Sequence, residues 1–377
     1  MKIHIVSAGE SVDTISALYE IPVNQLIFDN QLIYPYQLAI GQALFISDGL
    51  NVKNRNIYVN GYAYPFISRW VLENTLPYLS ELSVFSYGFT AEGDLIPPVL
   101  PVDWMLQMAF MYNAKPILTL TPFDEQGNFN NLLISSVINN AVATENLIQN
   151  ILTELNQKGY AGVDIDFEFI LRDDRFAFTQ FVQNMTNRLN AYGYQVSVAL
   201  APKTSDNQPG LLYEGKDYQA LGAAANHVLL MTYEWGYTYS TPMAVAPINK
   251  VRQVVDYALT VIPAEKINLG IPNYGYDWPL PYVQGVTRAT TIGNIQAVRI
   301  AIDNNATIQY DETAQTPFFT YIKNGISHEV WFEDIRSISA KFDLLEEKQL
   351  RGVGYWQIMQ LFRANWLTLD SRFYITK

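Results

Sequence analysis

Three acidic side chains occur at alternate positions in one short apolar stretch: Asp164, Asp166 and Glu168, with Ile165 and Phe167 between them. Successive side chains of a β-strand point to opposite faces, so a strand here would place all three carboxyl groups on one face within roughly 13 Å. Ionised carboxylates this close repel one another, so at least one pKa should rise and its proton be shared with a neighbour. A carboxyl group that stays protonated near neutral pH can act as a general acid. This stretch is therefore the candidate active site.

Two simpler interpretations of these acids fit the residues less well. A calcium-binding loop also spaces acids two residues apart, but it needs a turn glycine and polar intervening positions, whereas Ile165 and Phe167 favour a strand. A solvent-exposed edge strand can carry alternating acids too, but edge strands favour lysine and mixed charge. A catalytic site is the better explanation of three acidic side chains with no basic residue among them.

The same residues resemble the fourth-strand signature of glycoside hydrolase family 18, Asp-Gly-x-Asp-x-Asp-x-Glu. Gly162, Asp164, Asp166 and Glu168 match it, and Ala161 stands where the pattern often has its first aspartate. The resemblance implies that Glu168 is the general acid, that Asp166 orients the N-acetyl group of the substrate, and that Asp164 shares a proton with Asp166. The lost acid is the one farthest from the glutamate, so we interpret Ala161 as a change in the supporting network and not as loss of activity.

The mechanism that this resemblance implies differs from that of most glycosidases. Two-carboxylate enzymes use a second acid as nucleophile or base, whereas in this family the acetamido oxygen of the substrate attacks the anomeric carbon. Glu168 would protonate the leaving oxygen while Asp166 holds the acetamido N–H. Water deprotonated by Glu168 would then open the oxazolinium ion, so the configuration would be retained.

Other candidate residues follow the ends of predicted strands. The segment 231–235 resembles the family's Met-x-Tyr-Asp: Tyr233 matches the tyrosine that contacts the reacting N-acetyl group, while Glu234 replaces the usual aspartate and leaves its sugar contact open. Trp356 lies where the family has the tryptophan floor of the −1 sugar site. Further substrate-binding candidates at strand ends are Trp235, Tyr62, Tyr87 and Trp278, and for Trp278 packing under an insertion is the alternative.

Composition excludes several classes of function. The chain has 377 residues and a formal net charge of −12, which argues against nucleic acid and anionic membrane surfaces as partners. It has no cysteine and only three histidines, so we expect neither a disulfide nor a metal site, and no cofactor. No apolar run is long enough to cross a membrane, and no signal peptide is evident at the N-terminus.

Strands and helices are predicted to alternate from residue 57 onward. The candidate strands are 57–64, 82–89, 116–121, 162–168, 195–201, 227–233, 266–272 and 352–357. Helical periodicity falls between them, for example over 175–192. Eight strands with intervening helices predict an α/β fold, a (β/α)8 TIM barrel whose chemistry lies at the C-terminal strand ends. An open doubly wound sheet is the alternative, although no glycine-rich phosphate-binding sequence supports it.

Two parts of the chain do not fit the simple alternation. Residues 277–334 are predicted to form a small α+β insertion between the seventh and eighth strands. Residues 1–49 predict a strand, two helices and a strand, and resemble a LysM module, a family that binds N-acetylglucosamine-containing glycans; a small structural cap is the alternative. A polar linker over 48–54 would join this domain to the barrel domain at 50–377.

Together these features predict an enzyme that cleaves N-acetylglucosaminyl β-1,4 bonds. A LysM module with no cysteine and no evident signal resembles the spore cortex-lytic N-acetylglucosaminidases, which implies peptidoglycan as partner and the spore coat, cortex or cell wall as location. A chitinase and a non-catalytic glycan-binding barrel are the alternatives, and the retained Glu168 favours an enzyme. The sequence is silent on endo or exo action and on assembly, for which a monomer is the expectation.

Overall fold

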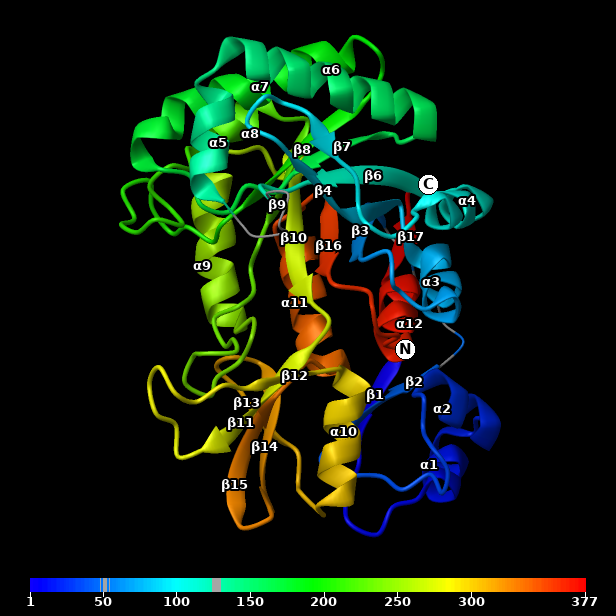
Figure 1. The fold of residues 1–377 in the computed structure, drawn as a ribbon. Coiled ribbons are helices and arrows are strands. Elements are labelled where there is room, and N and C mark those ends of the chain that lie inside the picture. The colour runs from blue at the N-terminus through cyan, green and yellow to red at the C-terminus, as the bar shows by residue number, and fades with distance from the viewer. Residues whose placement is uncertain (48, 50–52, 54, 124–129) are drawn as a thin grey trace.

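A computed structural model of the chain describes residues 1–47, 49, 53, 55–123 and 130–377. These residues form a barrel, a sheet inserted into it and an N-terminal module, and Figure 1 shows the sheet and the module next to each other below the barrel. Most of the predicted linker at 48–54 lies outside the described residues. The domain boundary at residues 49 and 50 therefore stays a prediction.

The barrel consists of eight parallel strands within the described part of the chain. In chain order they are β3 (Arg55–Ala63), β4 (Glu81–Phe89), β6 (Lys115–Leu120), β7 (Gly162–Ile165), β8 (Gln195–Leu200), β9 (His227–Leu230), β10 (Ile267–Pro272) and β16 (Gly352–Trp356). The ring closes because β16 pairs with β3, which in turn pairs with β4. The predicted (β/α)8 barrel is confirmed, and the open-sheet alternative is wrong.

Helices cover the outside of the barrel because its strands are apolar on both faces. They are α3 (Arg69–Thr75), α4 (Asp103–Met111), α5 (Asn131–Ile138), α6 (Ala141–Lys158), α7 (Arg175–Asn190), α8 (Tyr218–Ala224), α9 (Ile248–Leu259), α11 (Ile335–Glu347) and α12 (Arg363–Arg372). Two short strands, β5 (Leu95–Ile96) and β17 (Phe373–Ile375), extend the sheet at β4 and β3. Helix α7 ends two residues before the predicted end and buries the predicted apolar side chains, Phe178 and Phe181 among them.

The insertion between β10 and β16 is an antiparallel sheet with one helix. Its elements are β11 (Gly275–Leu280), β12 (Thr290–Ile292), α10 (Asn294–Asp303), β13 (Gln309–Asp311), β14 (Thr316–Lys323) and β15 (Ile326–Trp331), and the sheet order is β12-β11-β15-β14-β13. Ala297, Ala301, Phe319 and Val330 form its core. The predicted α+β insertion is confirmed.

A two-residue turn joins β14 and β15 into a hairpin. Asn324 and Gly325 have φ of +53° and +79°, and Lys323 pairs with Ile326 across the turn. Positive φ at both central residues is the hairpin turn that the Asn-Gly sequence favours. This local signal was available in the sequence and would have located the strands β14 and β15.

The N-terminal module has the predicted order, β1 (Lys2–Ile5), α1 (Val12–Tyr19), α2 (Val23–Asp29) and β2 (Ala43–Ile46). Its two strands are antiparallel, with Lys2 opposite Ile46. Ser11 caps α1 by accepting a hydrogen bond from Thr14 N. The module thus has secondary structure and a small apolar core of its own.

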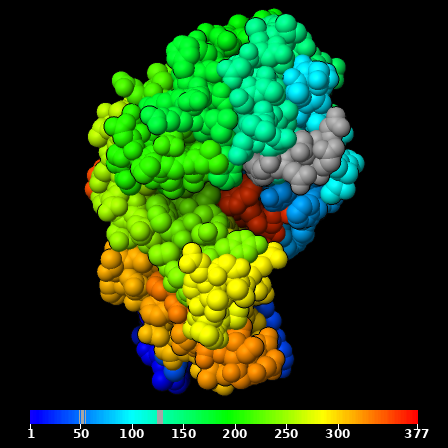
Figure 2. Space-filling model, turned by 60° about the vertical axis from the view of Figure 1, so that its left-hand side comes forward, coloured from blue at the N-terminus to red at the C-terminus, as the bar shows by residue number. Residues whose placement is uncertain are grey.

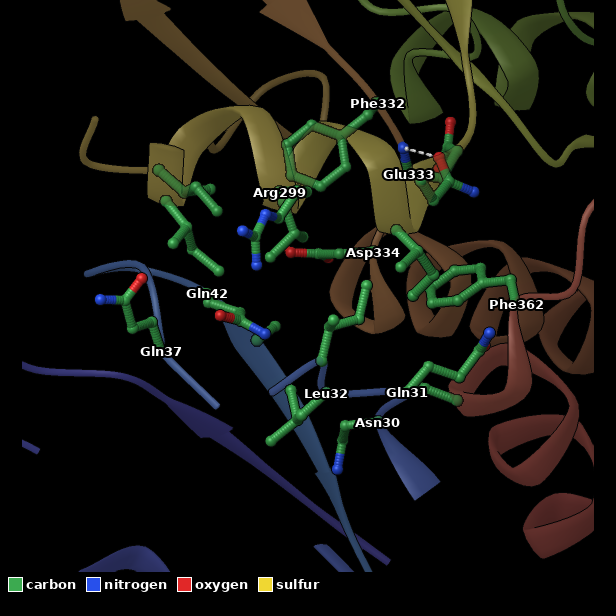
Figure 3. Close-up of a pocket in the computed structure, with 18 residues that line it drawn as sticks. Asn30, Gln31, Leu32, Gln37, Gln42, Arg299, Phe332, Glu333, Asp334 and Phe362 are labelled. Carbon is green, nitrogen blue, oxygen red and sulfur yellow. Dashed lines mark hydrogen bonds between the residues drawn. The ribbon is translucent and has the colours of Figure 1, made fainter. Parts of the chain in front are cut away.

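The module is docked on the insertion and on the last barrel helices. Ile308 N donates to Ile40 O at 2.9 Å, and Arg363 N donates to Gln31 Oε1 at 2.6 Å. Gly41 is required at this contact, because a Cβ there would lie 1.9 Å from Ile308 O. A pocket remains at the junction, and Figure 3 shows Gln42 of the module opposite Arg299 of α10 and Asp334 at the start of α11.

Candidate active site

Strand β7 and the residues after it carry the three acids. The strand ends at Ile165 and not at Glu168 as predicted, although Asp166 N still donates to Leu120 O of β6 at 2.9 Å. Phe167 is buried against Phe178 and Phe181 of α7, with ring centroids 5.9 and 5.8 Å apart. The alternation therefore turns the apolar side chains toward the helices and the acids toward the barrel interior.

Asp164 is the most enclosed of the three acids. Its Oδ1 accepts a hydrogen bond from Ser197 Oγ at 2.5 Å, and its Oδ2 accepts one from Tyr62 OH at 2.9 Å. Burial raises the pKa of Asp164, while these two hydrogen bonds act to lower it. Ser197 was not singled out in the sequence, but it lies directly beside Asp164 in the β7–β8 register.

Asp166 is buried and incompletely paired. Its Oδ1 has no hydrogen-bond partner among the described residues. Burial and the charges of Glu168 and Asp164 raise its pKa well above the usual carboxyl range, and Lys216 acts in the opposite direction. The expected rise of a pKa in this cluster is therefore present. No hydrogen bond joins Asp164 to Asp166 in the described part of the chain, so their shared proton stays a prediction.

Glu168 is half-buried and faces a pocket. Burial raises its pKa, and the positive charge of Lys216 opposes the rise. Three further predicted residues, Tyr233, Glu234 and Trp235, line the same pocket. The remaining lining residues are Pro202, Leu212, Tyr213 and Met231. A carboxyl group with a raised pKa beside an open, partly aromatic pocket is suited to donate a proton to a bound molecule.

Tyr233 and Glu234 follow β9, which ends at Leu230. Tyr233 is largely buried, and burial together with the charge of Asp166 raises the pKa of its hydroxyl. Glu234 has a φ of +65° and accepts hydrogen bonds from Tyr274 OH and, at 2.9 Å, from Tyr276 OH. Although its side chain is partly exposed, desolvation raises the pKa of Glu234 and the two tyrosines oppose the rise. Glu234 is therefore held by protein hydroxyl groups.

Trp356 ends β16 and is half-buried among aromatic rings. Its ring lies edge-on to Phe85, Tyr62 and Tyr64, with centroids 4.8, 5.7 and 6.1 Å away. In Figure 2 a red segment from the C-terminal part of the chain lies at the bottom of a hollow that green and blue segments border. A half-buried tryptophan at the mouth of the barrel keeps ring surface available for a sugar.

Three predicted substrate contacts are corrected by their burial. Tyr87 is fully buried, and its hydroxyl donates to Glu154 of α6 at 2.9 Å. Tyr62 is 2% exposed and its hydroxyl is used by Asp164. Trp278 is fully buried in the insertion, where its Nε1 donates to Ser240 O at 2.8 Å. Packing under the insertion, the alternative for Trp278, is what the structure has.

The displacement of Tyr87 has a specific cause in β4. Between Val84 and Tyr87 the strand advances three residues while its partner β6 advances two, from Leu118 to Leu120. Such a bulge shifts the alternation of side chains by one position. Tyr87 therefore points outward to α6 and not into the barrel mouth.

Lysine 216 was not singled out in the sequence, yet it lies beside the acids. Its side chain is fully buried, and its Nζ donates to Ala199 O at 3.3 Å.

No group of three or more His, Cys, Asp or Glu side chains in the described ranges is arranged to hold a metal ion. Nor is any described helix long and apolar enough to cross a membrane.

Comparisons with known proteins agree with this geometry. The sequence profile described as glycosyl hydrolases family 18 matches residues 127–360, and the LysM domain profile matches residues 4–47. The cortical fragment-lytic enzyme of Bacillus subtilis (strain 168) is 38% identical over 100% of this chain and 99% of the relative. The crystal structure of the Bacillus megaterium QM B1551 spore cortex-lytic enzyme SleL has a TM-score of 0.94 at 33% identity, covering 100% of this chain and 98% of that one. A Chromobacterium violaceum chitinase is similar in fold, with a TM-score of 0.76 at 24% identity over 84% of this chain and 98% of that one.

Proposed function

The chain belongs to glycosyl hydrolases family 18, and from this premise we propose that it hydrolyses N-acetylglucosaminyl β-1,4 bonds of spore cortex peptidoglycan by a retaining, substrate-assisted mechanism. Glu168, with its raised pKa beside an open pocket, is the observation that carries the proposal. A glycan-binding barrel without activity would have no need to keep this acid protonated and facing the pocket.

Cortex peptidoglycan is the substrate that the similarity supports best. The cortical fragment-lytic relative matches this chain from end to end, module and barrel together. The chitinase is similar in fold over 84% of the chain. The similarity thus favours cortex over chitin, and chitin cleavage remains an outcome of the experiment below.

Glu168 acts as general acid and then as general base. Burial raises its pKa, which favours the protonated form that donates to the oxygen of the leaving sugar. Once that sugar has left, the ionised Glu168 removes a proton from the attacking water. One residue serves both steps, so its loss affects both halves of the reaction.

Asp166 orients the acetamido group for attack on the anomeric carbon. Its buried Oδ1 is an acceptor without a partner among the described residues, and a buried acceptor of this kind is stabilised by a donor. The acetamido N–H of the −1 sugar is such a donor. Tyr233 lines the same pocket as Glu168, and its hydroxyl contacts the acetamido group in the proposed complex.

Asp164 and Trp356 support the reacting groups. The hydrogen bonds from Ser197 and Tyr62 hold Asp164 as an acceptor whose charge lies next to Asp166. A negative charge there favours a proton on Asp166 before substrate binds and stabilises the positive charge that develops on the oxazolinium ion. The ring of Trp356 forms the floor of the −1 site.

The module and the barrel both engage the glycan wall. LysM and family 18 domains occur here in one chain, which supports binding of peptidoglycan or chitin-type glycans. We propose that the module holds the protein on insoluble cortex or cell wall, where the protein acts as a monomer. Neither a metal nor a cofactor takes part in the proposed reaction.

The test is cleavage of purified cortex fragments and, in parallel, of chitin. Mass spectrometry identifies the new reducing-end sugar, and NMR at early times identifies the anomer of the product. We expect N-acetylglucosamine at the new end, a retained anomer, and faster cleavage of cortex than of chitin.

Other outcomes contradict specific parts of the proposal. N-acetylmuramic acid at the new end would mean a muramidase, and an inverted anomer would mean a two-carboxylate mechanism. Equal cleavage of substrates with a free amine at C2 of the −1 sugar would contradict acetamido attack, because an amine has no carbonyl oxygen. Binding without cleavage would favour the glycan-binding barrel.

A further inference from the structure

Lys216 lies in the loop between β8 and α8, where three contacts fix its position. The preceding residue, Gly215, packs against the backbone just after Glu168, since a Cβ at Gly215 would lie 2.3 Å from Ile170 O. Lys216 O accepts a hydrogen bond from Lys203 Nζ at 2.8 Å. Lys216 N donates to Tyr213 O at 3.1 Å. The loop therefore carries Lys216 directly against the segment that bears the acids.

The side chain of Lys216 ends at a backbone carbonyl of β8, close to the position of Asp166. Its Nζ donates to the carbonyl of Ala199, and Ile165 of β7 pairs with Val198 of β8. Ala199 is the next residue of β8, and Asp166 is the residue that directly follows the end of β7. The ammonium group is thus held at the carbonyl that neighbours Asp166, at the C-terminal end of the barrel where the pocket opens.

The surroundings leave the charge of Lys216 only partly compensated. The side chain is fully buried, and Ala199 O is the hydrogen-bond acceptor described for its three donors. The buried Asp166 Oδ1 likewise has no partner in the described part of the chain. A buried ammonium is costly unless negative charge is close, and Asp166 and Glu168 are the negative groups that act on it.

We infer that Lys216 is a positioning residue of the proposed reaction: its buried ammonium is the countercharge that keeps one of the pair Asp166 and Glu168 ionised while the other holds the proton. This inference rests on the proposed function, because it acts through the same two carboxyl groups. The inference assigns a role to a residue outside the acidic motif, in the loop that follows β8.

The pH dependence follows from the sign of the charge. A positive charge lowers the pKa of a nearby carboxyl group, so removing it raises the pKa values of the pair, and both limbs of the rate profile move to higher pH. Burial lowers the pKa of Lys216 itself to about 8, against the effect of the two acids, so its charge is present at neutral pH. Besides Lys216, the charged or titratable groups that face Asp166 and Glu168 are Asp164, Glu234, Tyr62, Tyr64 and Tyr233. Lys203, which donates to Lys216 O, lies next to Asp206.

The test is the pH profile of kcat/KM on purified cortex fragments for the full chain and two variants. Lys216→Met keeps an unbranched side chain of similar length without the charge, and we expect both limbs to move up by roughly 1 pH unit or more. Lys203→Met is the matched control, because it removes the other buried lysine of this loop and the bond to Lys216 O. It should lower the rate without moving the limbs.

Each result decides the inference. Unmoved limbs in Lys216→Met, or equal shifts in both variants, would overturn it. If Lys216→Met does not fold, Lys216→Arg is measured instead, since a guanidinium keeps the positive charge. Limbs of the pH profile at the wild-type pH values support the inference. Limbs that move to higher pH overturn it. A wild-type chain inactive at every pH counts against the proposed function instead, so the two failures are distinguishable.

Discussion

Single carboxyl groups determine the chemistry proposed here, and each can be tested by an isosteric change. Glu168→Gln removes the proton donor and keeps the shape of the pocket. We expect hydrolysis of cortex fragments to fall by roughly 10²–10⁴-fold or more while binding stays nearly intact, because this residue serves both steps. Glu92→Gln, at an exposed glutamate outside the pocket, is the control. Turnover within a few-fold of wild type would remove Glu168 from the mechanism.

Asp166 should make the folded chain less stable as pH rises. Its pKa in the folded chain is well above the ordinary value, so the favourable contribution of the protonated form is fully present below about pH 4 and is lost as pH rises through the folded pKa. Asp166→Asn does not titrate. Compared with wild type it should be equally stable near pH 4 and more stable at pH 8, by about 1.4 kcal/mol for each unit of the pKa rise.

Chemical denaturation at the two pH values measures this difference. Asp173→Asn, at an exposed aspartate, should show no such gain. The same Asp166→Asn variant should lose turnover more than substrate binding, because an orienting contact matters mainly in the transition state. A stability difference between variant and wild type that is no larger at pH 8 than at pH 4 would contradict the raised pKa.

Tyr62 illustrates how a residue predicted to contact sugar can serve the acids instead. Tyr62→Phe leaves Asp164 Oδ2 without its donor, so we expect a loss of about 1–3 kcal/mol in unfolding free energy and a lower kcat. Tyr355→Phe is the matched control, since its buried hydroxyl donates to Asn365 and not to an acid. It should lower stability but leave kcat unchanged. Unfolding curves and kcat for both variants separate the two effects.

Strand β7 positions the acids only because its first residue has no side chain. A Cβ at Gly162 would lie 2.3 Å from Gln195 O of β8. Gly162→Ala should therefore push β7 away from β8 and lower both the melting temperature and kcat. Gly193→Ala is the comparison, because its φ is +84° but no atom lies within 4 Å of the added carbon. It should cost about 1 kcal/mol through backbone strain alone, and kcat should not change. Equal effects on kcat would mean that β7 tolerates the shift.

The docked module links stability to wall binding in the molecule as a whole. Deletion of residues 1–49 should weaken adsorption to insoluble cortex, because linked binding sites raise the effective concentration of the catalytic domain. It should also lower the melting temperature, since Phe45 belongs to the main apolar core and the contact with Ile308 is lost. Sedimentation assays with cortex and thermal unfolding measure the two effects.

Gly41→Ala separates wall binding from docking. The added carbon would collide with Ile308 O at a residue whose φ is +82°, so docking should loosen while the module stays in the chain. We expect lower stability and retained adsorption to cortex.

For the variant that lacks residues 1–49, undiminished adsorption to cortex would favour the interpretation of the module as a structural cap.

Local patterns in the sequence determined the main outline of this protein. The alternation of acids and apolar residues between Asp164 and Glu168 depends on a two-residue period, and the helical spacing in α7 on a period of 3.6; both are properties of neighbouring residues. The same holds for the order of elements in the module. The β/α alternation then sufficed to predict the barrel and which ends of its strands carry the chemistry.

Only the tertiary structure decided which side chains meet. The bulge in β4 turns Tyr87 outward, and the insertion buries Trp278 against Ser240. Lys216 lies fifty residues after Asp166 in the chain, yet its charge acts on that carboxyl group. The N-terminal module docks on Ile308, which is more than 250 residues away from Ile40 in the sequence. Burial, strand register and the electrostatic field at a carboxyl group depend on contacts between distant residues, and no period in the local sequence encodes them.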